Sequence, residues 1–144
     1  MADQLAADKS VSYNLSAITL LGAILNRGDQ EIADGLDFGF QIQITHNVYP
    51  EEQKVDVTVT ASLLVIETKA LMAKVAVGYR FDFLNFDQLN LGKNNTLPVD
   101  LANSINGLSV STTRGVFFSQ VRGTSLHNVV MPLVDMQKWE QEVD

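Results

Sequence analysis

The chain has 144 residues, of which 46% are hydrophobic and 19% are charged, and its formal net charge at pH 7 is −7. This length suits one domain with a sizeable core, and the composition excludes a disordered tail or a charged linker. The acidic balance argues against nucleic acid, whose partners carry a basic footprint, and against an anionic membrane surface. We therefore expect one domain over residues 1–144 that binds neither.

Cysteine is absent, which excludes a disulfide framework and a thiolate metal site. The N-terminal residues lack the basic and apolar regions of a signal peptide. The longest apolar stretch, residues 17–25, is far too short to cross a bilayer. These features favour a cytoplasmic location without direct membrane insertion. The mean hydropathy of +0.07 further predicts that some apolar surface stays exposed for a partner.

After an expected flexible arm at residues 1–10, the sequence predicts strands over residues 11–83. Residues 13–25 have apolar side chains at both odd and even positions, which is typical of a strand buried on both faces or of a short helix; length and threonine content favour the strand. Residues 36–45, 55–65 and 71–81 alternate apolar with polar positions, as half-buried strands do. Short polar breaks between neighbouring segments predict an antiparallel meander.

Residues 97–144 are predicted to be mainly helical, because the apolar spacing changes to three and four. Pro98 suits a first helical turn and Arg122-Gly123 is a stop signal. A second, short helix is expected from Asp135 onward. Strands followed by helices predict an α+β fold: a four-stranded antiparallel sheet with a long and a short C-terminal helix on one face. The apolar face of the long helix is expected at Leu101, Ile105, Leu108, Thr112 and Val116.

Motifs for catalysis or metal binding do not emerge. The histidines, His46 and His127, have no zinc-binding spacing. Gly92-Lys93 lacks the earlier glycine of a phosphate-binding loop, and Ser109 lacks the second glycine of a nucleophile elbow. We therefore predict no catalytic residue, no metal site and no cofactor, and we expect that the protein is not an enzyme.

Apolar residues in the last third of the chain suggest surfaces for partners. Residues 129–134 are apolar where a loop is usually polar, so they either pack under the last helix or line a groove. Phe117 and Phe118 are adjacent, so one helix face cannot bury both. Glycines inside the helix would allow another helix to approach closely. The candidates for a subunit interface are Gly107, Ser111, Gly115 and Phe118.

Two stretches resemble the SecB family of export chaperones. Residues 55–63 are similar to the family's third strand, and residues 122–134, from Arg122-Gly123 to beyond Pro132, resemble the run before its last helix. The order of four strands and two helices agrees over nearly the whole chain. The family's Pro-Tyr-Ala-Arg-Glu run is here replaced by Ser-Thr-Thr-Arg-Gly at residues 111–115, and the loop expected at residues 26–35 lacks the usual tryptophan.

The resemblance implies a homotetramer, a dimer of dimers, that acts as an ATP-independent holdase. Family members keep unfolded preproteins soluble in apolar grooves and pass them to the SecA motor. Divergent SecB-like proteins instead serve one antitoxin in toxin–antitoxin–chaperone systems, which is the alternative, and a non-catalytic structural subunit of a larger complex is a further alternative. Carried over by position, the client-binding candidates are Ile32, Leu36, Leu126, Val129, Met131, Leu133, Met136 and Trp139.

Overall fold

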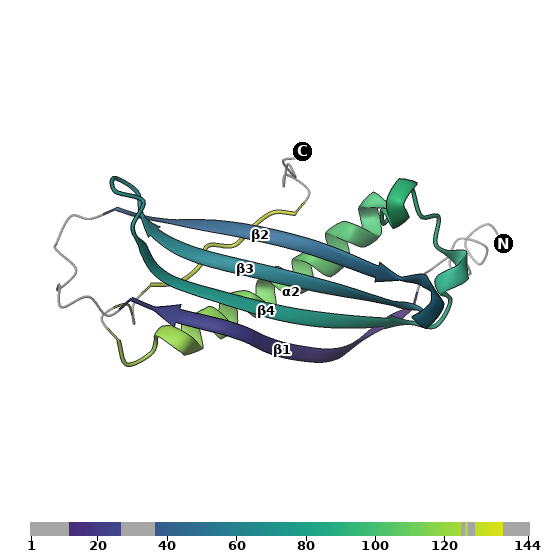
Figure 1. The fold of residues 1–144 in the computed structure, drawn as a ribbon, viewed down its shortest axis with the longest axis horizontal. Helices are drawn as coiled ribbons and strands as arrows, with labels where there is room; N and C mark the ends of the chain where they lie inside the picture. Colours follow the sequence, from purple (N-terminus) through teal and green to yellow (C-terminus); the bar gives the residue numbers. More distant parts are fainter. Residues whose placement is uncertain (1–11, 27–36, 125, 127–128, 137–144) are drawn as a thin grey trace.

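The computed structural model describes residues 12–26, 37–124, 126 and 129–136 (Figure 1). Its strands are β1 (Tyr13–Leu25), β2 (Phe38–Tyr49), β3 (Lys54–Val65) and β4 (Leu71–Phe83), and its long helix is α2 (Val99–Val121). Short 3-10 turns lie at Pro50–Glu52, Phe86–Gln88 and Lys93–Asn95. The predicted arm, Ile32, Leu36, Trp139 and nearly all of the predicted short helix fall outside the described residues.

The strands form one antiparallel sheet in the order β1-β4-β3-β2, so that β1 and β2 are its edges (Figure 1). The predicted α+β fold, a four-stranded antiparallel sheet followed by a long helix, is thus confirmed. The central strands alternate as expected: every odd-numbered residue of β3, such as Val57 and Val59, is buried and faces the core. Figure 1 shows α2 behind the sheet, on that buried face.

The mixed pattern of β1 comes from two β-bulges. The register against β4 shifts between Leu15 and Ala17 and again between Leu20 and Gly22. Each extra residue reverses the alternation of side chains, so apolar residues of both parities reach the same face. The predicted strand is confirmed, but its expected burial on both faces is wrong. The large aliphatic residues that remain 46–57% exposed are Ile18, Leu20, Leu21 and Ile24.

The ends of α2 agree with the sequence, and its buried face agrees in part. The helix begins after Pro98 and ends at Val121, and Gly123 follows with a φ of 81°, which glycine adopts without steric cost. Of the expected apolar face, Ile105 is fully buried and Leu101 and Val116 pack partly buried against the core, but Leu108 is 42% exposed. The buried residues of the helix are Ile105, Asn106, Ser109, Val110, Thr113, Phe117 and Val121.

Polar residues occupy this face because each finds a hydrogen-bond partner. The Tyr79 hydroxyl lies 2.6 Å from Oγ1 of Thr113, whose own hydroxyl donates to the Ser109 carbonyl at 2.8 Å. Nε2 of His46 lies 2.5 Å from Oδ1 of Asn106. These two side-chain contacts tie α2 to β4 and to β2 at fixed positions along the helix.

Aromatic packing adds a third anchor between the helix and the sheet. Phe117 is fully buried and meets Phe40 of β2 edge-on, with 5.1 Å between the ring centroids. The neighbouring Phe118 is only half-buried, and the Arg122 guanidinium lies 5.3 Å from the centroid of its ring. Only one of the two adjacent phenylalanines therefore belongs to the core.

The buried Tyr79 predicts a specific dependence of stability on pH. Burial raises the pKa of Tyr79 above its ordinary value of 10.0, outweighing the opposite effect of the hydrogen bond to Thr113. Its contribution to stability is therefore complete below pH 10 and is lost as the pH rises through the raised pKa. We expect Tyr79→Phe to lower the free energy of unfolding by about 1 kcal/mol at neutral pH. Urea denaturation should show this difference shrinking above pH 10, and a constant difference would contradict the assignment.

Candidate functional site

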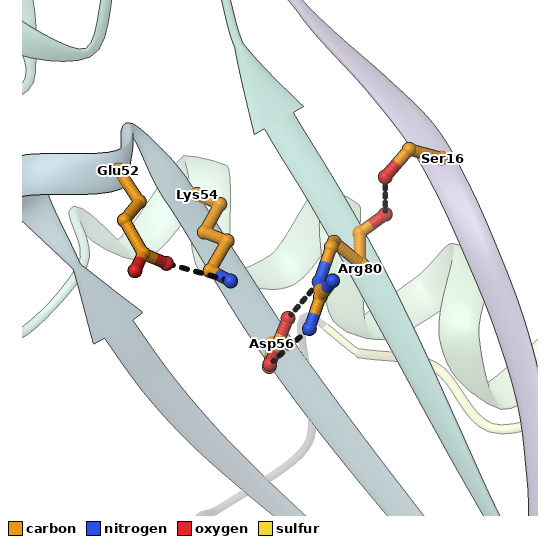
Figure 2. A network of polar contacts seen from close by, with 5 residues as sticks. All are labelled: Ser16, Glu52, Lys54, Asp56 and Arg80. Atoms are coloured by element: carbon orange, nitrogen blue, oxygen red, sulfur yellow. Dashed lines mark hydrogen bonds and ion pairs between the residues drawn. The ribbon is translucent and has the colours of Figure 1, made fainter.

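The outer face of the sheet, away from α2, is polar and carries paired charges. Arg80 on β4 lies opposite Asp56 on β3, with Nε 3.0 Å from Oδ1, and this carboxylate raises the pKa of the guanidinium (Figure 2). The Ser16 hydroxyl, at the first bulge of β1, donates to the Arg80 carbonyl at 3.2 Å, and Lys54 pairs with Glu52 at 2.6 Å. Exposed pairs of this kind add little stability, so they supply polar groups to the outer face rather than a strong anchor.

Two shallow hollows flank this framework, and neither holds a catalytic arrangement. One, of about 250 Å³, is lined on the outer face by residues that include Leu21, Gly78 and Arg80. The other, of about 350 Å³, lies near the start of α2 between Tyr13 and Asp100. Within the described ranges, no group of three or more histidine, aspartate or glutamate side chains is arranged to hold a metal ion. The exposed apolar surfaces of the sheet are therefore the candidate site.

The first apolar surface lies on edge strand β1. We call it the β1 surface and define it as the four exposed aliphatic residues of that strand. Ile18 and Leu20 lie opposite Tyr79 and Val77 on the side of α2, which leaves them exposed because it lies mainly against β3 and β4. Leu21, over Gly78, and Ile24, opposite Lys74, lie on the outer face, so the surface wraps around the edge. Exposed aliphatic side chains on neighbouring positions of one strand mark a contact surface rather than ordinary scatter. These residues are Ile18, Leu20, Leu21 and Ile24.

The second apolar surface lies on the opposite edge. The inward-facing apolar residues of β2 pack against the core but remain only half-buried, because α2 lies mainly against β3 and β4 and reaches this strand at His46 and Phe40. Sequence alternation assigned them to the core, and the incomplete cover became visible only when the helix was placed. Phe40 is the member that also reaches Phe117. We call this set the β2 inner face: Phe38, Phe40, Ile42, Ile44 and Val48.

Residues 129–136 form an extended segment, here called the strap, on the same side of the sheet as α2. In Figure 1 it runs behind the sheet and emerges beyond β2. Nε of Arg114 donates to the Met131 carbonyl at 2.7 Å. Met136 also packs against the helix at Gly107, where a Cβ would lie 3.6 Å from its Cγ, an ordinary van der Waals contact. The strap is thus fixed to α2 at both positions.

The strap places the sequence-predicted client-binding residues unequally. Leu126, just before it, and Met131 and Met136 within it are buried in the chain's own core, and Val129 is half-buried. Leu133 is 78% exposed, and Val130, three residues earlier, is 47% exposed. The segment therefore packs on α2 and also presents apolar side chains to solvent, whereas its packing under the last helix or in a groove stays a prediction.

The predicted interface residues are also spread over different surroundings. Gly107 contacts Met136 of the same chain, and Phe118 lies beneath Arg122. Ser111 and Gly115 are exposed, and a Cβ on Gly115 would meet nothing within 4 Å. Their assignment to a subunit interface stays a prediction, as does the assignment of the client-binding residues. Arg114 and the β2 inner face are the features that sequence reasoning missed.

The comparisons with known proteins concern the whole fold. No protein-family model matches the chain, and no curated protein matches it. A solved structure does: the Mycobacterium tuberculosis Rv1957 SecB-like chaperone in complex with a ChAD peptide from the Rv1956 HigA1 antitoxin. The TM-score is 0.62, with 15% sequence identity over 92% of this chain and 94% of the other. The fold is that of a SecB-like chaperone. The resemblance seen in the sequence is thereby confirmed at the level of the fold.

Arg114 offers a direct test of the strap. We expect Arg114→Leu to free residues 129–136, because a hydrogen bond from a charged donor contributes about 1.5–3 kcal/mol. Amide hydrogen exchange in this segment, followed by mass spectrometry, should become at least about tenfold faster. The matched control is Arg122→Leu, which removes an exposed arginine just after the last residue of the same helix and should leave the strap unchanged. Equal exchange in both variants would show that Arg114 does not hold the segment.

Proposed function

We propose that this protein is a chaperone of the SecB type, which binds unfolded polypeptide without ATP and keeps it soluble for export or assembly. The observation that carries the proposal is the partly covered β2 inner face, within a SecB-like fold. The bound antitoxin peptide of the neighbouring structure supports a polypeptide as the partner. The same neighbour, a chaperone, supports a function without catalysis.

Binding of this kind needs exposed apolar area and no reaction chemistry. Each square ångström of apolar surface removed from water contributes about 25 cal/mol, whatever the sequence that covers it. An unfolded client presents apolar side chains along an extended backbone, and these side chains can cover Ile42, Ile44 and Leu133. Because these residues are already held by the sheet and the strap, little chaperone entropy is lost on binding. A reversible holdase follows from these properties.

The β1 surface supports the homotetrameric assembly that the sequence resemblance implies. Four large aliphatic residues that are each about half exposed would favour aggregation unless another surface covers them regularly. A second copy offers the same strand with the same apolar residues, and a two-fold axis makes such a surface self-complementary. The exposed side of α2, with Ser111 and Gly115, is the candidate contact between two such dimers.

We expect Leu20→Lys to disrupt this assembly, because it places a charge on the apolar contact that we assign to a second copy. The measurement is molar mass by light scattering, at equal concentration and with circular dichroism to check folding. Leu84→Lys makes the same change at a leucine that is 77% exposed just after β4, outside both apolar surfaces. A wild-type tetramer that Leu20→Lys leaves intact would refute the role of β1, and a wild-type monomer would refute the assembly itself.

Client binding is tested by Leu133→Ser, which removes an exposed apolar side chain from the strap. We expect about fivefold more of this variant to be needed for half-suppression of the aggregation of reduced insulin in the absence of ATP. The control Leu84→Ser changes a leucine of nearly the same exposed fraction, 77% against 78%, and should behave as wild type. Equal activity of the two variants would remove Leu133 from the client-binding surface. Absence of suppression by the folded wild type would argue against a general holdase.

The second candidate is a dedicated chaperone of one antitoxin, and the peptide in the neighbouring structure is the observation that favours it. It predicts rescue of a cognate antitoxin together with no effect on unrelated unfolding proteins. Export through SecA predicts binding to purified SecA, whereas a purely structural subunit predicts no client binding. A cytoplasmic location suits all of these roles. No helix in the described part of the chain is long and apolar enough to span a membrane.

A further inference from the structure

The hollow at the start of α2 has an apolar floor and a polar rim. Its volume of about 350 Å³ is within the range of sites that hold a ligand or a few side chains. The other lining residues, among them Asp100 and Ser104, are polar and exposed. An occupant should therefore combine an apolar side chain with a polar neighbour. The apolar lining residues, all half-buried, are Tyr13, Leu89, Pro98 and Leu101.

The floor of this hollow is fixed by contacts within the chain. The ring of Tyr13 meets Phe81 edge-on, with 5.6 Å between the centroids, and lies 5.5 Å from the ring of Phe83. The backbone N–H of Leu89 donates to the Phe86 carbonyl at 3.0 Å. Because these residues are already ordered, an occupant loses little affinity to the ordering of its site.

The rim of the hollow carries one uncompensated charge. Asp100, in the first turn of α2, is the acidic residue of the lining, and the lining contains no lysine, arginine or histidine. The salt bridges of the described residues join Lys54 to Glu52 and Arg80 to Asp56, so Asp100 has no ionic partner among them. A cation next to an apolar side chain would complement both the rim and the floor.

The chain enters the sheet at the mouth of this hollow. The N–H of Ser12 donates to Oδ1 of Asn85 at 3.2 Å, and its carbonyl accepts the N–H of Leu84 at 3.1 Å. Residue 12 is thereby held next to Tyr13, which lines the hollow. Residues 1–11, which lie outside the described residues, are joined to the chain at this point.

We infer that residues 1–11 fold back and fill this hollow, with Leu5 on its floor and Lys9 beside Asp100. The segment has the required chemistry, because Leu5 is followed by two alanines and Lys9 is its one basic residue. The eight residues from Leu5 to Tyr13 can span up to about 27 Å, which is ample for a return to the hollow. The inference goes beyond the proposed function, because the lining contains no member of the β1 surface or the β2 inner face.

Covalent attachment makes a weak contact sufficient. A short tether gives an effective concentration of about 1 mM, so a contact with a dissociation constant of about 0.3 mM would be formed about three quarters of the time. Exposed ion pairs add little, so Leu5 should supply most of the attraction while Lys9 orients the segment. The hollow is then closed most of the time by the chain itself and is withheld from other apolar segments.

The test measures access to the hollow with a thiol reagent. The chain contains no cysteine, so N-ethylmaleimide at pH 7 modifies a single introduced thiol. Ser104→Cys places this thiol on the rim, and Ser119→Cys, at an exposed serine near the other end of α2, is the matched control. Each is prepared in the full-length chain with and without Leu5→Ser. Labelling rates are followed by mass spectrometry, and circular dichroism checks folding.

Docking predicts that Leu5→Ser accelerates labelling at position 104 at least about threefold and leaves position 119 unchanged. Lys9→Gln should give a smaller acceleration, which about 1 M sodium chloride abolishes because salt screens the ion pair. Equal labelling at position 104 with and without Leu5→Ser would overturn the inference. Acceleration at both positions would also overturn it, because Leu5 would then stabilise the fold as a whole.

Two other occupants give different results in the same experiment. Residues 137–144 follow Met136, which packs at Gly107, about two helical turns from Asp100. Acceleration by Trp139→Ser and not by Leu5→Ser would assign the hollow to that segment and overturn the inference. Labelling at position 104 that becomes faster on dilution of the protein would assign it to a second copy, with the same consequence.

Discussion

The width of a single helix governs most of this structure. An α-helix with its side chains is about 10–12 Å across, whereas four strands spaced about 4.8 Å apart make a sheet that is nearly twice as wide. Helix α2 lies against β3 and β4, the two central strands, and these contain the most completely buried residues. The inner sides of β1 and β2 are therefore covered only in part by the same helix. The half-buried β2 inner face and the exposed Ile18 and Leu20 of β1 follow from this.

The position of α2 is fixed by polar contacts as much as by apolar packing. Thr113 and Asn106 are buried and bonded to Tyr79 and His46, so sliding or turning the helix would break bonds that the interior cannot replace. Arg114 extends these contacts to the strap, because its Nε donates a hydrogen bond to the Met131 carbonyl. The position of the strap therefore depends on contacts that run from the sheet through the helix.

The strap and the two edges together suggest a division of tasks. The β1 surface is apolar and irregular, which favours an interface that stays closed. Strand β2 is regular and contains no acidic or basic residue other than His46, and its inner face is only half-buried, which favours a partner that binds reversibly. The proposed function without ATP would need both properties, because an assembly would have to persist while clients bind and dissociate.

The sequence predicts the central strands and the helix ends well, because these follow from local patterns. Alternation identifies β3 and β4, and Pro98 and Gly123 mark the limits of α2. The buried face of α2 could not be read from hydrophobicity, since Asn106 and Thr113 are buried only because residues far along the chain bond to them. The bulges of β1 were hidden for a related reason: they are defined by the register against β4, which no local pattern contains. The resemblance predicted the fold that contains the site. The incomplete cover of the β2 inner face follows from the position of α2 over the sheet, which the sequence does not show.

The most direct test of this division of tasks is amide hydrogen exchange of the wild-type protein, measured alone and saturated with an unfolded client. The account predicts that β1 is protected in both states, and that the outer-edge amides of β2 exchange rapidly in the free protein and slow down on client binding. Protection of β2 without a client, or a response confined to β1, would contradict it.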